Sequence, residues 1–79
     1  VYMKNKFNKG APPSIGWWPV TIDPQKNLHK KKEHLPHRWW DGKYWSLPAW
    51  GSNSIKTVAI IANIKSQCVH LEWTSRWWE

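Results

Sequence analysis

The segment at residues 37–46, HRWWDGKYWS, indicates how the centre of the chain folds. Asp41 and Gly42 lie between two aromatic-rich flanks, which is the strongest short-range signal for a β-hairpin with a two-residue turn. The turn also sets the register of the two arms, because it decides which residues face each other. The predicted facing pairs are Trp40 with Lys43, Trp39 with Tyr44, and Arg38 with Trp45.

Side chains along the predicted hairpin alternate between two faces, because successive residues of a strand point in opposite directions. Trp39 and Tyr44 therefore share one face. The other face combines indoles with cations, in the set Arg38, Trp40, Lys43, Trp45 and Leu47. Arg38 opposite Trp45 is a natural cation–π pair. We therefore expect an aromatic and cationic surface on one side of the hairpin.

Two more strands are predicted outside the hairpin. Residues 15–22, IGWWPVTI, are rich in strand-forming side chains. Pro19 has no N–H to donate to a ladder, which indicates an edge strand or a bulge. Residues 69–74, VHLEWT, alternate regularly, with Val69, Leu71 and Trp73 directed inward.

The segment from Ser52 or Asn53 to about Ser66 has the pattern of a capped helix. Its apolar side chains fall at helical spacing, in the set Ile55, Val58, Ala59, Ile61 and Ala62. A buried strand is the alternative, because Ile and Val are β-branched, but the segment is long for a strand. We predict a small α+β fold, a three- to four-stranded antiparallel sheet with one helix packed on a face.

The chain is expected to form one domain with a basic N-terminal arm. Residues 1–14 contain Gly10 and the pair Pro12-Pro13, which break regular structure, and we interpret them as flexible. Residues 15–79 form the domain, and residues 23–36 form a basic loop that carries Lys30, Lys31 and Lys32. The net charge of +7 favours an anionic partner, although it also serves solubility.

The nine tryptophans are too many for the single buried face of a small sheet. Six of them occur as neighbours, at 17–18, 39–40 and 77–78. Neighbours on a regular strand point to opposite faces, so each pair should place one indole inward and one outward. The outward rings either bind a ligand or are covered by another segment or a second copy of the chain.

No motif for catalysis or for a cofactor emerges. Cys68 is the only cysteine, so an internal disulfide is impossible, and its pairing with His70 lacks a third orienting group. The histidines at 29, 34 and 37 match no zinc-site spacing, and the acidic residues are not arranged for acid–base chemistry. We expect no enzyme, no metal, no cofactor, no signal peptide and no membrane span, and therefore a cytoplasmic protein.

The predicted function is binding of nucleic acid or a nucleotide. Bases would stack on the indoles while phosphates meet the cations. The candidate site combines the hairpin face with the basic loop, in the set Arg38, Trp40, Lys43, Trp45, Lys30, Lys31 and Lys32. The alternative is a protein–protein interface, because Trp and Arg are typical hot-spot residues, and homo-oligomer formation also stays open.

Three blocks of the sequence resemble small tryptophan-rich proteins of tailed bacteriophages and prophages, whose function is unassigned. They are GWWP at 16–19, RWWDGKYWS at 38–46 and WTSRWW at 73–78. The first two blocks are also similar to a short bacterial domain of unknown function that carries GWYP and RYWDGxxWT. The resemblance implies a phage product in the cytoplasm of a bacterial host. A host enzyme or defence complex would then be the protein partner.

Overall fold

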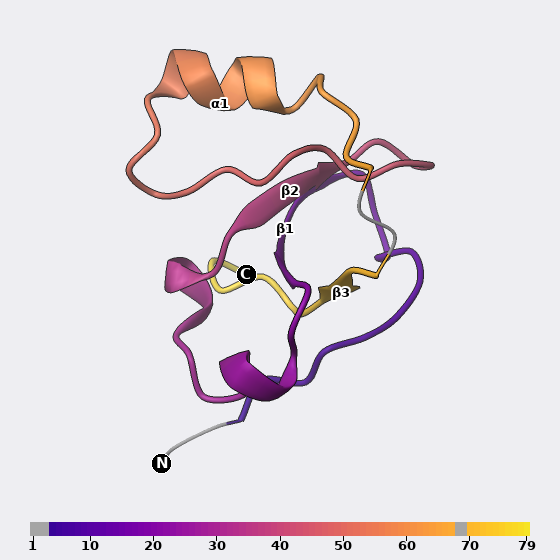
Figure 1. Ribbon diagram of the computed structural model, residues 1–79, viewed down its shortest axis with the longest axis vertical. Helices are drawn as coiled ribbons and strands as arrows, with labels where there is room; N and C mark the ends of the chain where they lie inside the picture. The colour runs from indigo at the N-terminus through magenta and orange to yellow at the C-terminus, as the bar shows by residue number, and fades with distance from the viewer. Residues whose placement is uncertain (1–3, 68–69) are drawn as a thin grey trace.

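The computed structural model describes residues 4–67 and 70–79 and confirms a small α+β fold, with a three-stranded antiparallel sheet and one α-helix (Figure 1). In chain order the elements are β1 (Gly16–Thr21), the 3-10 helices η1 (Gln25–Asn27) and η2 (Lys32–His34), β2 (His37–Trp40), α1 (Ile55–Ile61) and β3 (Glu72–Trp73). No helix in the described part of the chain has the length and apolar character of a membrane span.

Strand β1 lies in the centre of the sheet, in the order β2-β1-β3, so the prediction of an edge strand was wrong. Its first four residues pair with β2, and Val20 and Thr21 pair with β3. The N–H of Val20 donates toward the β2 side, to Pro36 O, so the N–H that Pro19 lacks would have pointed toward β3. Pro19 is accommodated there because β3 is only two residues long, while its carbonyl still accepts from Thr74 N.

The core lies under one face of β1. Trp18 is 4% exposed, and its ring meets the Trp73 ring edge-on at 5.2 Å. Val20 and Leu35 are completely enclosed, and Pro19, Ala49 and Leu71 are also buried. Leu71 confirms the inward direction predicted for the last strand, whereas Val69 lies outside the described residues.

The described part of the predicted flexible arm, residues 4–14, is bound to the domain. The N–H of Asn5 donates to Leu28 O, and the buried Asn5 side chain donates to Asn27 O and Lys30 O. Asn8 exchanges two backbone hydrogen bonds with Trp73. These amides use backbone acceptors that local sequence patterns do not reveal.

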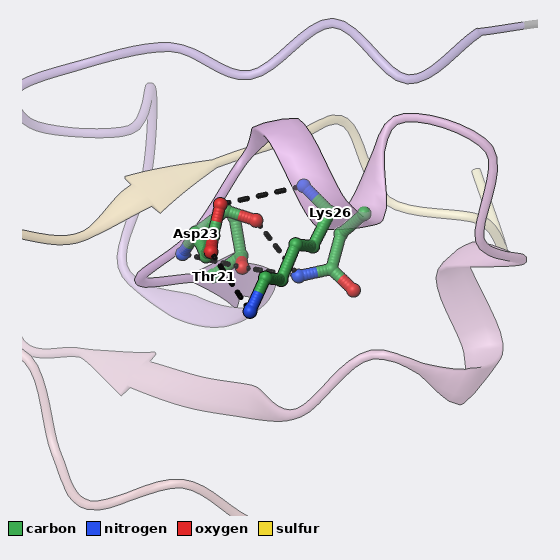
Figure 2. A network of polar contacts seen from close by, with 4 residues as sticks. Thr21, Asp23 and Lys26 are labelled. Atoms are coloured by element: carbon green, nitrogen blue, oxygen red, sulfur yellow. Dashed lines mark hydrogen bonds and ion pairs between the residues drawn. The ribbon is translucent and has the colours of Figure 1, made fainter.

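The basic loop at residues 23–36 is ordered by short polar contacts at its start (Figure 2). Thr21 Oγ1 accepts from Asp23 N and from Asn27 Nδ2, at 3.0 and 2.7 Å. Asp23 Oδ1 accepts from Lys26 N, and Lys26 Nζ lies 3.9 Å from the second carboxylate oxygen. These contacts lie at the start of η1. The loop then continues through η2 to β2.

The hairpin is present, but its turn is longer than predicted. Trp40 faces Trp45, so four residues, 41–44, form the turn in place of two. Asp41 Oδ1 accepts from both Lys43 N and Tyr44 N, while Asp41 N donates to Tyr44 O. The Asp41 side chain thus holds a wider turn together, and Gly42 supplies the positive φ of 102° that it needs.

Helix α1 is shorter than predicted and is not packed on the sheet. Its N-cap is Ser54, whose Oγ accepts from Thr57 N. None of residues 55–61 is buried, and Ile55 is 90% exposed. The predicted apolar side faces Trp17 and Trp39, but an open groove of about 400 Å³ separates them. In Figure 1 the segment after β2 runs between α1 and the sheet, which explains the separation.

The doubled tryptophans follow the alternation rule only where a strand is regular. Trp18 is buried and contacts Trp73, whereas Trp17 is half-buried and meets Trp39 at 5.6 Å. Trp77 and Trp78 follow β3 in a turn and are both half-exposed. The prediction therefore holds for the first pair and is wrong for the last.

Candidate functional site

The end of the hairpin carries two indoles in contact. The rings of Trp40 and Trp45 lie 5.0 Å apart at an angle of 56°, and both residues are half-buried. The four-residue turn brings them opposite each other, so the wider turn changes their partners but keeps them on one face. We name the set Trp40, Lys43, Tyr44, Trp45 and Lys65 the hairpin-tip surface.

Two ammonium groups lie over the ring of Tyr44 on the hairpin-tip surface. Lys65 Nζ is 3.5 Å from the ring centroid, and Lys43 Nζ is 5.3 Å from it. No local pattern predicts that Lys65 lies here, because a long-range pairing positions it. Leu47 N donates to Ile64 O, and Ser66 N donates to Trp45 O. The tip thus combines exposed cations with aromatic rings.

Asp41 is the carboxylate beside these cations. The backbone N–H of Tyr44, followed by that of Lys43, lowers the pKa of Asp41. Its Oδ1 is occupied by these two N–H groups and holds the turn. Lys43 and Lys65 carry two positive charges and Asp41 carries one negative charge, so the net charge of the tip is positive.

Arg38 does not belong to the exposed site, contrary to the prediction. It is 9% exposed, and its Nη1 donates to Ser46 O at 3.3 Å and to Ser66 Oγ at 2.7 Å. Its guanidinium therefore joins β2 to the second hairpin arm and to the segment after α1. The predicted contact between Arg38 and Trp45 is replaced by the contact between Trp40 and Trp45.

The lysines of the basic loop lie apart from the hairpin tip. Lys30 and Lys31 are exposed, and Lys32 Nζ donates to Ser75 Oγ. They precede β2, whereas the tip follows it, so the four-residue strand lies between the two groups along the chain (Figure 1). The predicted site is therefore two cationic areas at opposite ends of β2.

A second aromatic site lies on the other side of β2, and the sequence analysis missed it. We name it the indole pocket and define it by Trp17, Glu33, His37, Trp50, Trp77 and Trp78. It has a volume of about 270 Å³. Pairing of His37 with Ala49 positions Trp50, and the turn after β3 brings in the last two indoles. No local pattern links these segments, which explains why the pocket escaped prediction.

His37 is held in its neutral form at the base of the indole pocket. Nδ1 lies 2.9 Å from Leu35 O, which can only accept, so Nδ1 carries the proton. Nε2 then accepts from Trp77 Nε1 at 3.0 Å. Burial lowers the pKa of His37, and the hydrogen bond to Leu35 O offsets this only in part.

We expect acid to destabilise the protein through His37. Because the pKa of His37 is lower in the folded state than in the unfolded chain, the unfolded chain binds a proton at His37 first as the pH falls below about 6.5. The free energy of unfolding should therefore fall from pH 7 to pH 5, as urea titrations at several pH values will show. His37→Gln should have a shallower slope over this window. Equal slopes in the two proteins would contradict the assignment.

The described residues contain no group of three or more His, Cys, Asp or Glu side chains that is arranged to hold a metal ion. The proposed partner of His70, Cys68, lies outside the described residues. Comparison of the chain with protein-family models, curated proteins and solved structures gives no match.

Proposed function

We propose that the protein is a non-enzymatic binding protein for nucleic acid or nucleotides, and that bases stack on the hairpin-tip surface. The observation that carries this proposal is the contact of Trp40 with Trp45, together with the ammonium groups of Lys43 and Lys65 over the ring of Tyr44, the residue before Trp45 in the chain. Stacking of a base on an aromatic side chain contributes about 1–3 kcal/mol and tolerates any base. The net charge of +7 favours the approach of a polyanion.

The basic loop extends this site for longer strands. Lys30 and Lys31 precede β2, at the opposite end of that strand from the tip (Figure 1). A mononucleotide would therefore use the hairpin tip alone. An oligonucleotide would also meet the loop, so affinity should rise with length and fall with salt.

We expect Trp45→Ala to weaken the binding of a short single-stranded DNA about tenfold, because it removes one stacking surface. Fluorescence anisotropy of a labelled oligothymidine at low and moderate salt measures this effect. Lys65→Glu should weaken binding and also reduce the dependence on salt. Lys56→Glu on α1 is the control, because it makes the same charge change at an exposed position outside the tip.

The outcomes of this titration separate stacking from bulk charge. Equal losses in Lys65→Glu and Lys56→Glu, with full affinity in Trp45→Ala, would mean that net charge alone attracts the DNA. That result would contradict the hairpin tip as a site. Saturable binding that depends on Trp45 supports it.

The second candidate is a protein–protein binder, as a phage-encoded inhibitor in the cytoplasm of a bacterial host would be. The observation that favours it is the exposure of large apolar side chains, with Ile55 at 90%, Ile22 at 66% and Ile60 at 57%. An interface anchored by such groups depends weakly on salt, in contrast to phosphate contacts. Sedimentation of the purified protein would show whether a second copy covers them.

A further inference from the structure

The indole pocket presents three half-exposed rings. Trp50, Trp77 and Trp78 are 47%, 50% and 48% exposed, and Trp17 completes the aromatic wall. Trp77 and Trp78 meet edge-on at 5.2 Å, so their ring faces point in different directions. Trp77 Nε1 donates to His37 Nε2, which leaves the aromatic faces as the surface that a ligand would meet.

Glu33 is the single charged side chain among the described residues that line this pocket. It is exposed, and among residues 4–67 and 70–79 its carboxylate forms neither an ion pair nor a hydrogen bond. An unpaired carboxylate is notable in a chain with twelve basic residues. The lining of the pocket therefore carries one carboxylate and no ammonium or guanidinium group, although the net charge of the whole protein is +7.

Three lysines, at positions 30–32, precede Glu33 in the chain but lie outside the pocket lining. His37 is neutral, because its Nε2 accepts from Trp77. Arg76 lies outside the pocket lining and forms an ion pair with Glu79 at 2.8 Å. Its guanidinium carbon is 5.7 Å from the Trp78 ring centroid, within the range of a cation–π contact.

We propose that the indole pocket binds a small organic cation that carries a trimethylammonium group. The faces of indole rings attract such a cation, and a quaternary ammonium has no N–H groups that must be satisfied. The Glu33 carboxylate supplies the complementary charge at the rim, and it would repel an anion. The site shares no residue with the hairpin-tip surface, so the inference stands independently of the proposed function.

Choline and its neutral carbon isostere, dimethylbutanol, are matched probes for this site. We expect choline to shift the indole N–H resonances of Trp50 and Trp77 and to bind at least about tenfold more tightly than dimethylbutanol. Glu33→Gln should weaken choline binding about three- to tenfold, and Trp78→Leu about tenfold. A comparison of trimethyllysine with lysine shows whether the indole pocket also binds a trimethylammonium group at the end of an amino-acid side chain.

Two controls make the test decisive. Glu72→Gln removes a negative charge outside the pocket and should leave choline binding unchanged, and Trp45→Ala should do the same. Equal binding of choline and dimethylbutanol, or full choline affinity in both Glu33→Gln and Trp78→Leu, would overturn the proposal. Oligonucleotide binding in these two variants reports on the hairpin tip separately, so failure of one site is distinguishable from failure of the other.

Discussion

Trp18→Ala should destabilise the fold by about 3–5 kcal/mol, the typical cost of removing a buried tryptophan. Trp18 is 4% exposed, meets the Trp73 ring at 5.2 Å and donates from Nε1 to Ser14 O at 2.9 Å. The guanidinium carbon of Arg76 lies 4.0 Å from its ring centroid. The substitution removes all these contacts at once. Because small domains are stable by only about 5–15 kcal/mol, much of the variant could be unfolded at moderate temperature.

Urea denaturation followed by circular dichroism measures this effect without depending on the indole that is removed. Trp50→Ala is the matched control, since Trp50 is 47% exposed and its loss should cost far less. If the two variants unfolded at the same urea concentration, Trp18 would not be the centre of the core.

Arg38→Ala should also cost much stability, about 2–4 kcal/mol, although the residue is charged. The change removes the hydrogen bonds to Ser46 O and Ser66 Oγ, and it leaves a cavity where the guanidinium lay. The second arm of the hairpin and the segment after α1 would both lose their hydrogen bond to the Arg38 side chain. Thermal unfolding of the variant, compared with the parent protein, measures the loss.

Two further variants distinguish this structural role from a role in ligand binding. Arg38→Lys keeps the charge but not the guanidinium geometry, so it should recover only part of the stability. Lys43→Ala removes an exposed cation and should be close to neutral for folding. If the Arg38→Ala protein were as stable as the parent protein but bound oligonucleotides more weakly, Arg38 would be an exposed ligand-binding residue and not a buried structural one.

Local signals in the sequence predicted the elements better than their connections. Strand β1, the hairpin around Asp41 and the helix near Ser54 follow from alternation, turn residues and caps, which act over a few residues. The length of the turn was misjudged because Asp41 uses its side chain to bond two N–H groups, which stabilises four residues where Asp-Gly alone indicates two.

The same difference between local signals and distant contacts applies to the candidate site. Trp40 and Trp45 could be placed on one face because a shift of register by two residues preserves the faces of a hairpin. Alternation along β2 correctly places Arg38 on the same face as Trp40. Whether that face is covered depends on Ser66, which is distant in the sequence and accepts a hydrogen bond from the Arg38 side chain. Lys65 and the indole pocket depend on such distant pairings throughout, and no spacing rule predicts them.

The pairing of Asn8 with Trp73 joins residues 65 positions apart. Closing so large a loop costs conformational entropy before the contact contributes anything in return. The hairpin can form early from neighbouring residues, whereas the flank of β1 that receives β3 must wait for a remote part of the chain. During that interval an unpaired strand edge is open to other molecules, so folding rate and chain concentration together decide how much protein escapes aggregation.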